Sequence, residues 1–194
     1  MHRSATAAGA RGTQTHQQQR ATVEVHLARL GRAPRYGSAM PSDLHLRHTE
    51  TFDSSPEHAF DRVLATPLPD IFAHRFWAIP PVDGTRGQAG AWGTVGQTRT
   101  IVLGDGGTMR EELTDVRRPQ RFGYRITEVT GPMKALVSAV DGTWSFDAAG
   151  AGCSVTWEWV VHPTRAGGPA MPVFGWMWRG NARQAFTEIG RLLA

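Results

Sequence analysis

The sequence is poor in several kinds of residue, and each shortage excludes a class of protein. Cys153 is the one cysteine among 194 residues, so an intramolecular disulfide and a cysteine-rich zinc site are both impossible. The uninterrupted apolar runs are a few residues long, whereas a membrane-spanning helix needs about 20. A single lysine stands beside twenty arginines, which indicates the codon bias of a GC-rich genome rather than selection for phosphate contacts. The near-absence of cysteine suits a reducing cytoplasm.

The net charge of +4 is distributed unevenly along the chain. Residues 1–39 hold six arginines against one acid and carry +5, whereas residues 40–194 carry −1. The part of the chain that can fold is therefore nearly neutral, which argues against a basic face for nucleic acid. We expect no nucleic-acid partner.

Residues 1–42 are expected to form a disordered N-terminal tail. The segment is rich in Ala, Thr, Gln, Gly and Arg, so it cannot bury enough apolar area to offset the entropy of ordering it. Three interpretations stay open: an organellar transit peptide, a basic tail that touches an acidic surface, and upstream sequence that is not native, with Met40 as the real start. The segment has neither a secretory apolar core nor a clear amphipathic stripe, which favours the last interpretation.

The rest of the chain, residues 43–194, predicts one domain. Apolar and polar residues alternate over 44–52, which predicts a half-buried strand. Ser55, Pro56 and Glu57 then predict a helix start, and a short helical piece is expected at 70–74. Residues 78–96 are expected to be irregular because of their prolines and glycines.

The second half of the domain predicts an antiparallel meander followed by one long helix. Turn residues separate five segments with strand patterns, at 97–103, 108–116, 120–129, 136–147 and 153–162. Apolar residues recur at helical spacing over 173–193. This order is typical of an α+β domain with its helices on one face of the sheet. Because one helix cannot cover a whole curved sheet, we expect an apolar gap between them.

Three local patterns accompany this order of elements. They are residues 51–60 at the first strand-to-helix junction (Thr-Phe-Asp-Ser-Ser-Pro-Glu-His-Ala-Phe), residues 119–125 (Pro-Gln-Arg-Phe-Gly-Tyr-Arg), and the pair 142–146 and 152–157 (Gly-Thr-Trp-Ser-Phe and Gly-Cys-Ser-Val-Thr-Trp). With them, residues 43–194 resemble the SRPBCC superfamily of START domains, the birch-pollen allergen and polyketide cyclase/dehydrases. The resemblance implies the helix-grip fold, a curved antiparallel sheet wrapped around a long C-terminal helix. It also implies a hydrophobic cavity and, in some members, cyclisation, dehydration or lipid carriage, but no shared catalytic set.

Glu111 is the strongest ionisable candidate, because it lies between two apolar residues on one face of its predicted strand. A hairpin through Gly104–Gly107 would bring Arg99 of the preceding strand beside it. Two interpretations stay open. Arg99, Glu111 and Tyr124 could orient a ligand or act as acid and base, or the two charges could form a purely structural ion pair.

Other chemistries lack support in the sequence. The histidines have no metal-binding spacing, so we expect no metal site and no cofactor. His48 is the most interesting of them, because it shares the inward face of the first strand. No Gly-x-Ser-x-Gly elbow is present, which argues against a nucleophilic hydrolase. Cys153 lies on an apolar face and is expected to be an inert buried thiol.

The sequence therefore favours binding of a hydrophobic small molecule, a lipid or a polyketide-like aromatic, between the sheet and the C-terminal helix. The first alternative is a polyketide cyclase/dehydrase-type enzyme, and the second is a partner-binding accessory protein with a filled core. Besides Glu111 and Tyr124, the residues expected to line the cavity are apolar: Phe52, Leu103, Met109, Leu113, Val140, Trp144, Trp157, Phe174 and Trp178.

Overall fold

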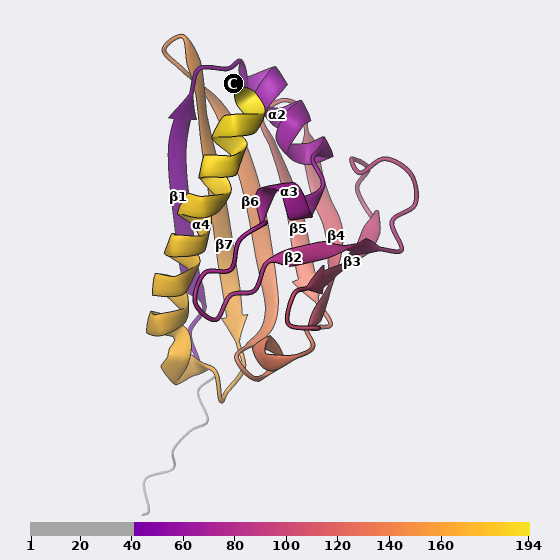
Figure 1. Ribbon diagram of the computed structural model, residues 1–194, viewed down its shortest axis with the longest axis vertical. Helices are drawn as coiled ribbons and strands as arrows, with labels where there is room; N and C mark the ends of the chain where they lie inside the picture. The colour runs from indigo at the N-terminus through magenta and orange to yellow at the C-terminus, as the bar shows by residue number, and fades with distance from the viewer. Residues whose placement is uncertain (1–40) are drawn as a thin grey trace, which may run out of the picture. The chain divides into compact units, whose positions relative to one another are not determined.

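The computed structural model describes residues 41–194, so the expectations for residues 1–40 lie outside it. The domain is built on one antiparallel sheet of seven strands in the order β1-β7-β6-β5-β4-β3-β2, with the helices on one face (Figure 1). The strands are β1 (Leu44–Phe52), β2 (Val82–Arg86), β3 (Thr98–Leu103), β4 (Thr108–Arg117), β5 (Arg121–Thr127), β6 (Val137–Ala149) and β7 (Gly152–Pro163). The α+β class and the meander from β3 to β7 are confirmed.

Two short helices follow β1. Helix α2 (Pro56–Ala65) begins as predicted, because the Ser55 Oγ accepts a hydrogen bond of 3.2 Å from the backbone N–H of His58. Helix α3 (Leu68–Ile71) lies slightly earlier than the expected piece at 70–74. Pro69 fits its first turn, where backbone N–H groups have no helical partner, so the proline-rich segment starts a second helix as well as ending the first.

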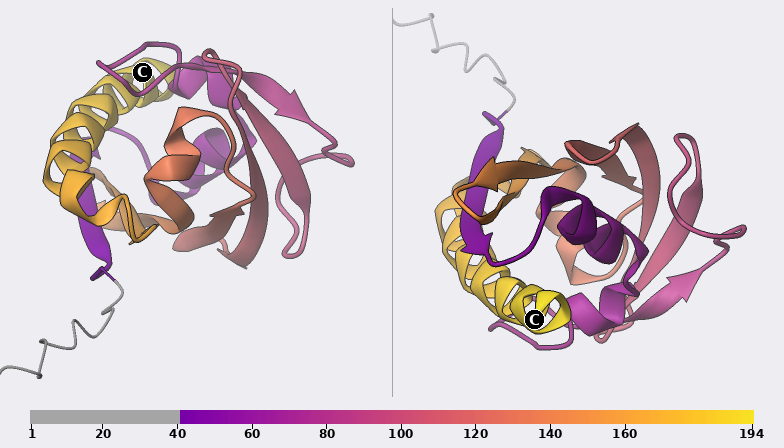
Figure 2. Two further views of the ribbon diagram at one scale, coloured as in Figure 1. Left: turned by 90° about the horizontal axis from the view of Figure 1, so that it is seen from below. Right: turned by 90° about the horizontal axis from the view of Figure 1, so that it is seen from above.

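The long helix α4 (Met171–Leu193) ends the chain and lies across the concave side of the sheet (Figure 2). Two glycines let its backbone approach β1 closely. A Cβ at Gly175 would lie 3.3 Å from the Leu46 side chain, and a Cβ at Gly190 would lie 3.3 Å from the Phe52 ring. The predicted helix-grip fold is therefore confirmed. None of the helices in residues 41–194 is long and apolar enough to cross a bilayer.

Strand β2 corrects one prediction, since it lies inside the stretch expected to be irregular. It is an edge strand that pairs with β3 alone, and its register shifts between Val82 and Gly84. An edge position tolerates the glycine and the bulge that would weaken a central strand. Its five residues therefore carry too little alternation to be read from the sequence. Two 3₁₀ turns, η1 (Pro132–Ala135) and η2 (Gly168–Ala170), complete the described chain.

Candidate functional site

A cavity of about 90 Å³ lies over the concave face of the sheet. Its floor comes from strands β3 to β7, and its roof comes from α2, α3 and the connection to β2 through Phe72 and Ile79. Helix α4 contributes Asn181 alone, a residue that is buried. The expected place of the cavity, under the C-terminal helix, is therefore corrected: the short helices and their connection cover most of it. Helix α4 carries a stripe of large apolar residues that pack directly on the sheet, so no space is left between them for the cavity.

The residues expected to line the cavity divide into two groups. Six of them do so: Leu103, Met109, Glu111, Tyr124, Trp144 and Trp157. The other five lie in the packed core or at its margin, away from the cavity wall: Phe52, Leu113, Val140, Phe174 and Trp178. Phe52 stacks on Phe186, and Trp178 packs on Trp157 with ring centroids 4.8 Å apart. These side chains help to fill the space between sheet and α4.

Arg99 and Glu111 form a buried ion pair in the cavity wall. Cross-strand register places the two residues opposite each other on β3 and β4, and the Arg99 Nε donates to the Glu111 Oε2 at 2.5 Å. The predicted proximity of these charges is thus confirmed. Both side chains are at most 7% exposed. Burial raises the pKa of Glu111 above its usual value, and the guanidinium of Arg99 opposes this shift without cancelling it.

The Arg99 guanidinium also stacks on Trp92, with its carbon 4.0 Å from the ring centroid. A second, outer pocket of about 260 Å³ adjoins the cavity on this side. The two spaces share Arg99, Trp92, Leu64 and Thr66 in their walls. Arg99 and Trp92 therefore stand between the inner cavity and a larger space next to the surface.

Tyr124 is the centre of a second polar group. Its hydroxyl accepts hydrogen bonds from the indole Nε1–H groups of Trp157 and Trp159, both at 2.7 Å. No acceptor among residues 41–194 takes the phenolic proton. Burial raises the pKa of Tyr124, and the charge of Glu111 adds to the shift, so the phenol stays protonated. With both lone pairs engaged, Tyr124 can serve a cavity ligand as a hydrogen-bond donor.

Gly142 makes this arrangement sterically possible. It is the cross-strand neighbour of Tyr124 on one side and of Trp159 on the other. A Cβ at Gly142 would lie 2.1 Å from the Tyr124 Cζ and 2.5 Å from its hydroxyl oxygen. The phenol therefore occupies the space that a side chain would fill, which is what a glycine inside a strand permits.

Aromatic rings form much of the remaining wall. The indoles of Trp144 and Trp157 stack with centroids 5.1 Å apart and planes 9° apart. Phe72 covers Trp157 from the roof, with centroids 5.3 Å apart. Flat apolar walls with a few convergent polar groups are characteristic of small-molecule sites.

Many wall residues were not identified as candidates from the sequence, among them Trp92, Trp159 and Asn181. Strand alternation in the sequence could have identified Trp159 as a wall residue, because it shares the inward face of its strand with Trp157. No such pattern marks Trp92, since it comes from an irregular glycine-rich stretch. His48 is not part of the wall: it bonds Glu50 at 2.7 Å and packs edge-on against Phe186. Cys153 is fully buried, as expected.

A curved sheet gripping a long helix and enclosing an apolar cavity with a few buried polar groups defines a helix-grip domain. The family described as polyketide cyclase/dehydrase and lipid transport matches residues 43–194, which is most of the chain. The chain belongs to this family, within the SRPBCC superfamily that its sequence resembles. No curated protein sequence matches it.

Solved structures share the fold at low sequence identity. Ara h 8.0201 superposes with a TM-score of 0.59 at 15% identity, covering 78% of this chain and 98% of that protein's chain. Ginseng major latex-like protein 151 from Panax ginseng gives 0.58 at 15% identity, covering 79% and 99%. XoxI from Bacillus cereus gives 0.55 at 18% identity, covering 77% and 94%. At these identities the likeness establishes the fold alone.

Proposed function

We propose that the domain binds a small hydrophobic molecule that carries one hydrogen-bond acceptor, such as a carbonyl oxygen. The observation that supports this most directly concerns the Tyr124 hydroxyl. Its oxygen accepts hydrogen bonds from two indole N–H groups, and its proton is free to be donated to a ligand. A ligand acceptor in the cavity would complete this set of hydrogen bonds. The apolar walls would hold the rest of the molecule.

The size of the cavity limits the ligand. An apolar cavity of about 150 Å³ admits benzene, so a space of about 90 Å³ holds only part of an aromatic molecule. The adjoining outer pocket of about 260 Å³ supplies the additional room. We infer that a ligand places its acceptor end inside, near Tyr124, and extends outward past Arg99 and Trp92.

The test compares two ligands of nearly the same shape. Acetophenone carries a carbonyl oxygen, and α-methylstyrene carries a CH₂ group in its place. By calorimetric titration the wild-type protein should prefer acetophenone by about tenfold, the effect of one hydrogen bond to a site built for it. Tyr124→Phe should abolish the preference.

Thr156→Val is the matched control, because it removes another buried hydroxyl that bonds Thr49 and does not line the cavity. It should leave the ratio of the two dissociation constants unchanged. Equal affinity of the wild type for both ligands, or a preference that survives in Tyr124→Phe, would contradict the proposal. Native mass spectrometry of the purified chain would then identify a natural ligand by its mass.

A second function, catalysis of the cyclase/dehydrase type, is favoured by one feature of the ion pair. Arg99 engages the Oε2 of Glu111, and no hydrogen bond within residues 41–194 occupies its Oε1. Glu111 lines the cavity, and its pKa is raised by burial, so its carboxyl group is closer to protonation than an exposed one. If a ligand co-purifies with the chain, an enzyme of this type would convert it over time with loss of water, and the Glu111→Gln variant would not.

A further inference from the structure

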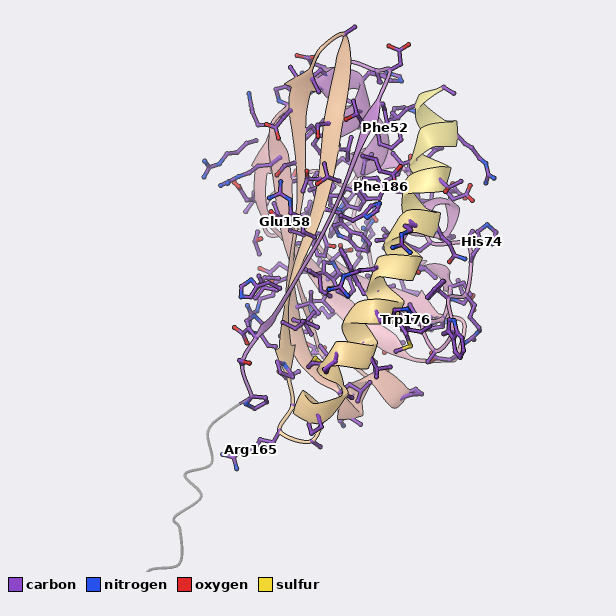
Figure 3. All side chains as sticks on the ribbon, turned by 90° about the vertical axis from the view of Figure 1, so that its left-hand side faces the viewer. Phe52, His74, Glu158, Arg165, Trp176 and Phe186 are labelled. Atoms are coloured by element: carbon purple, nitrogen blue, oxygen red, sulfur yellow. The ribbon has the colours of Figure 1, made fainter. Side chains whose placement is uncertain are left out.

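Exposed apolar side chains gather on the outer side of α4. Within residues 41–194, three of the four large apolar side chains that are most exposed lie there: Trp77 at 72%, Val173 at 59% and Trp176 at 49%. The rings of Trp77 and Trp176 contact each other edge to face, with centroids 5.3 Å apart. Val173 is one helical turn before Trp176, so it lies on the same face of α4. We call these three residues the tryptophan patch; Figure 3 labels Trp176 on the helix.

The backbone of Trp77 is strained. Phe76 and Ile79 exchange two backbone hydrogen bonds of 3.0 and 2.9 Å around a two-residue turn, and Trp77 occupies its first central position with φ +54°. Glycine is the usual residue at such a position, because a bulky side chain is strained there. The turn nevertheless carries an indole that is largely exposed to solvent. Its packing in the fold does not account for a large apolar ring there.

The turn is fixed firmly to α4. The Phe76 ring occupies the space above Gly180, where a Cβ would lie 2.0 Å from the ring. His74, just before the turn, contacts Glu188 of α4 at 3.2 Å; Figure 3 shows it beside the helix. A ring held in place before binding loses little conformational entropy when it inserts into another phase.

The charge around the tryptophan patch that has no opposite partner is positive, because Glu188, the acid beside His74, is already paired with His74 and Arg191. Arg75 in the turn segment and Arg179 and Arg183 on α4 are exposed, and none forms an ion pair within residues 41–194. No acidic residue occurs in residues 72–81 or in residues 171–187. The patch and these arginines therefore combine exposed indoles with uncompensated positive charge.

We propose that the tryptophan patch docks the domain on an anionic lipid surface. Tryptophan is enriched at the membrane–water interface, and each arginine near an anionic leaflet adds to the attraction. Two partly exposed indoles and a valine offer at most a few hundred Å², whereas a stable protein interface takes about 800 Å² from each partner. The chemistry and the size of the patch therefore favour a bilayer over a protein partner.

This docking surface goes beyond the proposed function and does not depend on it. The two are nevertheless next to each other, because Phe72 and Ile79, on either side of the turn, line the roof of the cavity. Docking would therefore place part of the cavity roof at the bilayer surface.

The test is flotation of the full chain with two kinds of vesicle, phosphatidylcholine alone and phosphatidylcholine with phosphatidylserine. Trp77→Asn keeps the turn, since asparagine tolerates positive φ, and Trp176→Gln suits a helix. Each should weaken binding to the anionic vesicles about tenfold, because an indole buries a large apolar area. Arg179→Gln should weaken it about fivefold and leave binding to neutral vesicles unchanged.

Two matched variants serve as controls. Val95→Ala alters the fourth exposed apolar residue, which lies in the connection between β2 and β3, and Arg86→Gln removes an exposed arginine at the end of β2, at the opposite edge of the sheet from β1, on which α4 packs. Both should bind vesicles like the wild type. The N-terminal arginines are the same in every variant, so they cannot produce a difference between them.

Three results would overturn the proposal. One is a wild-type chain that does not float with anionic vesicles. Another is a double variant, Trp77→Asn with Trp176→Gln, that floats as well as the wild type. The third is a wild type that is dimeric by light scattering and a Trp176→Gln variant that is monomeric, which would assign the patch to contact between two copies of the chain.

Discussion

The phenol of Tyr124 lies across the backbone of Gly142, in the volume that a side chain at that position would fill. This contact lets one hydroxyl reach two indole N–H groups on β7. The Tyr124 hydroxyl can therefore act as a hydrogen-bond donor in the cavity because position 142 carries no side chain.

Gly142→Ala should displace Tyr124 and lower the free energy of unfolding by about 1–3 kcal/mol, the cost of overpacking a core. It should also remove the preference for acetophenone. Urea denaturation measures the first effect. Gly84→Ala is the control, since a Cβ there meets nothing within 4 Å, and its effect should stay within about 0.5 kcal/mol. A stable Gly142→Ala variant that keeps the preference would show that the phenol is placed by other contacts.

Glu111→Gln should lower the free energy of unfolding by about 2–3 kcal/mol, because the buried guanidinium of Arg99 loses its counter-charge. Replacing both residues, Arg99→Met with Glu111→Leu, should restore stability to within about 1 kcal/mol of the wild type, since no charge then remains unpaired. If the pair also orients the ligand, the stable double variant should bind acetophenone about tenfold more weakly. Unchanged affinity in that variant would assign the pair to structure alone.

Stability should depend on pH through His162. Its Nε2 bonds Asp141 at 2.7 Å and its Nδ1 bonds Asp43 at 2.9 Å; the bond to Asp141 is the main reason that the pKa of His162 is raised. A histidine whose pKa is raised in the folded state contributes its full stabilisation at pH values below about 6.5, the ordinary pKa of the unfolded chain. This contribution to the free energy of unfolding is lost as the pH rises through the folded-state pKa. The Tm difference between wild type and His162→Gln should therefore be largest near about pH 6 and shrink as the pH increases. A Tm difference that stays constant between about pH 6 and about pH 9 would contradict this prediction.

Phe186→Ala should cost about 3–5 kcal/mol, because the ring is fully buried on α4 against Trp144 and His48. Val173→Ala, on the exposed face of the same helix, should cost less than about 0.5 kcal/mol. Thermal and chemical unfolding compare the two variants. A small loss for Phe186→Ala would mean that the register of α4 on the sheet differs from the one described.

The strands could be predicted where one face alone is buried. Apolar alternation in β1 and β7 follows directly from a sheet with a solvated outer face, and Ser55 with Pro56 marks the start of α2. Strand β2 could not be predicted, because an edge strand of five residues with a central glycine shows no apolar alternation. The approach of Arg99 to Glu111 was predictable because the hairpin through Gly104–Gly107 fixes the register between β3 and β4.

The cavity wall was harder to predict than the sheet. Trp157 and Trp178 are both buried aromatic residues on inward faces, yet Trp157 borders the cavity and Trp178 fills the core behind it. Which of two buried rings has a void beside it depends on how α3 and the connection to β2 cover the sheet. That arrangement is tertiary, and no periodicity within a strand or helix encodes it.

The stacked indoles of Trp144 and Trp157 give the cavity an optical signature. With centroids 5.1 Å apart, their electronic transitions couple, and this coupling falls steeply as the rings separate or turn. Both rings border the cavity, so a ligand that shifts either one would alter the circular dichroism of the aromatic region. Occupancy of the site can therefore be followed in unlabelled protein, without a substrate or an assay for product.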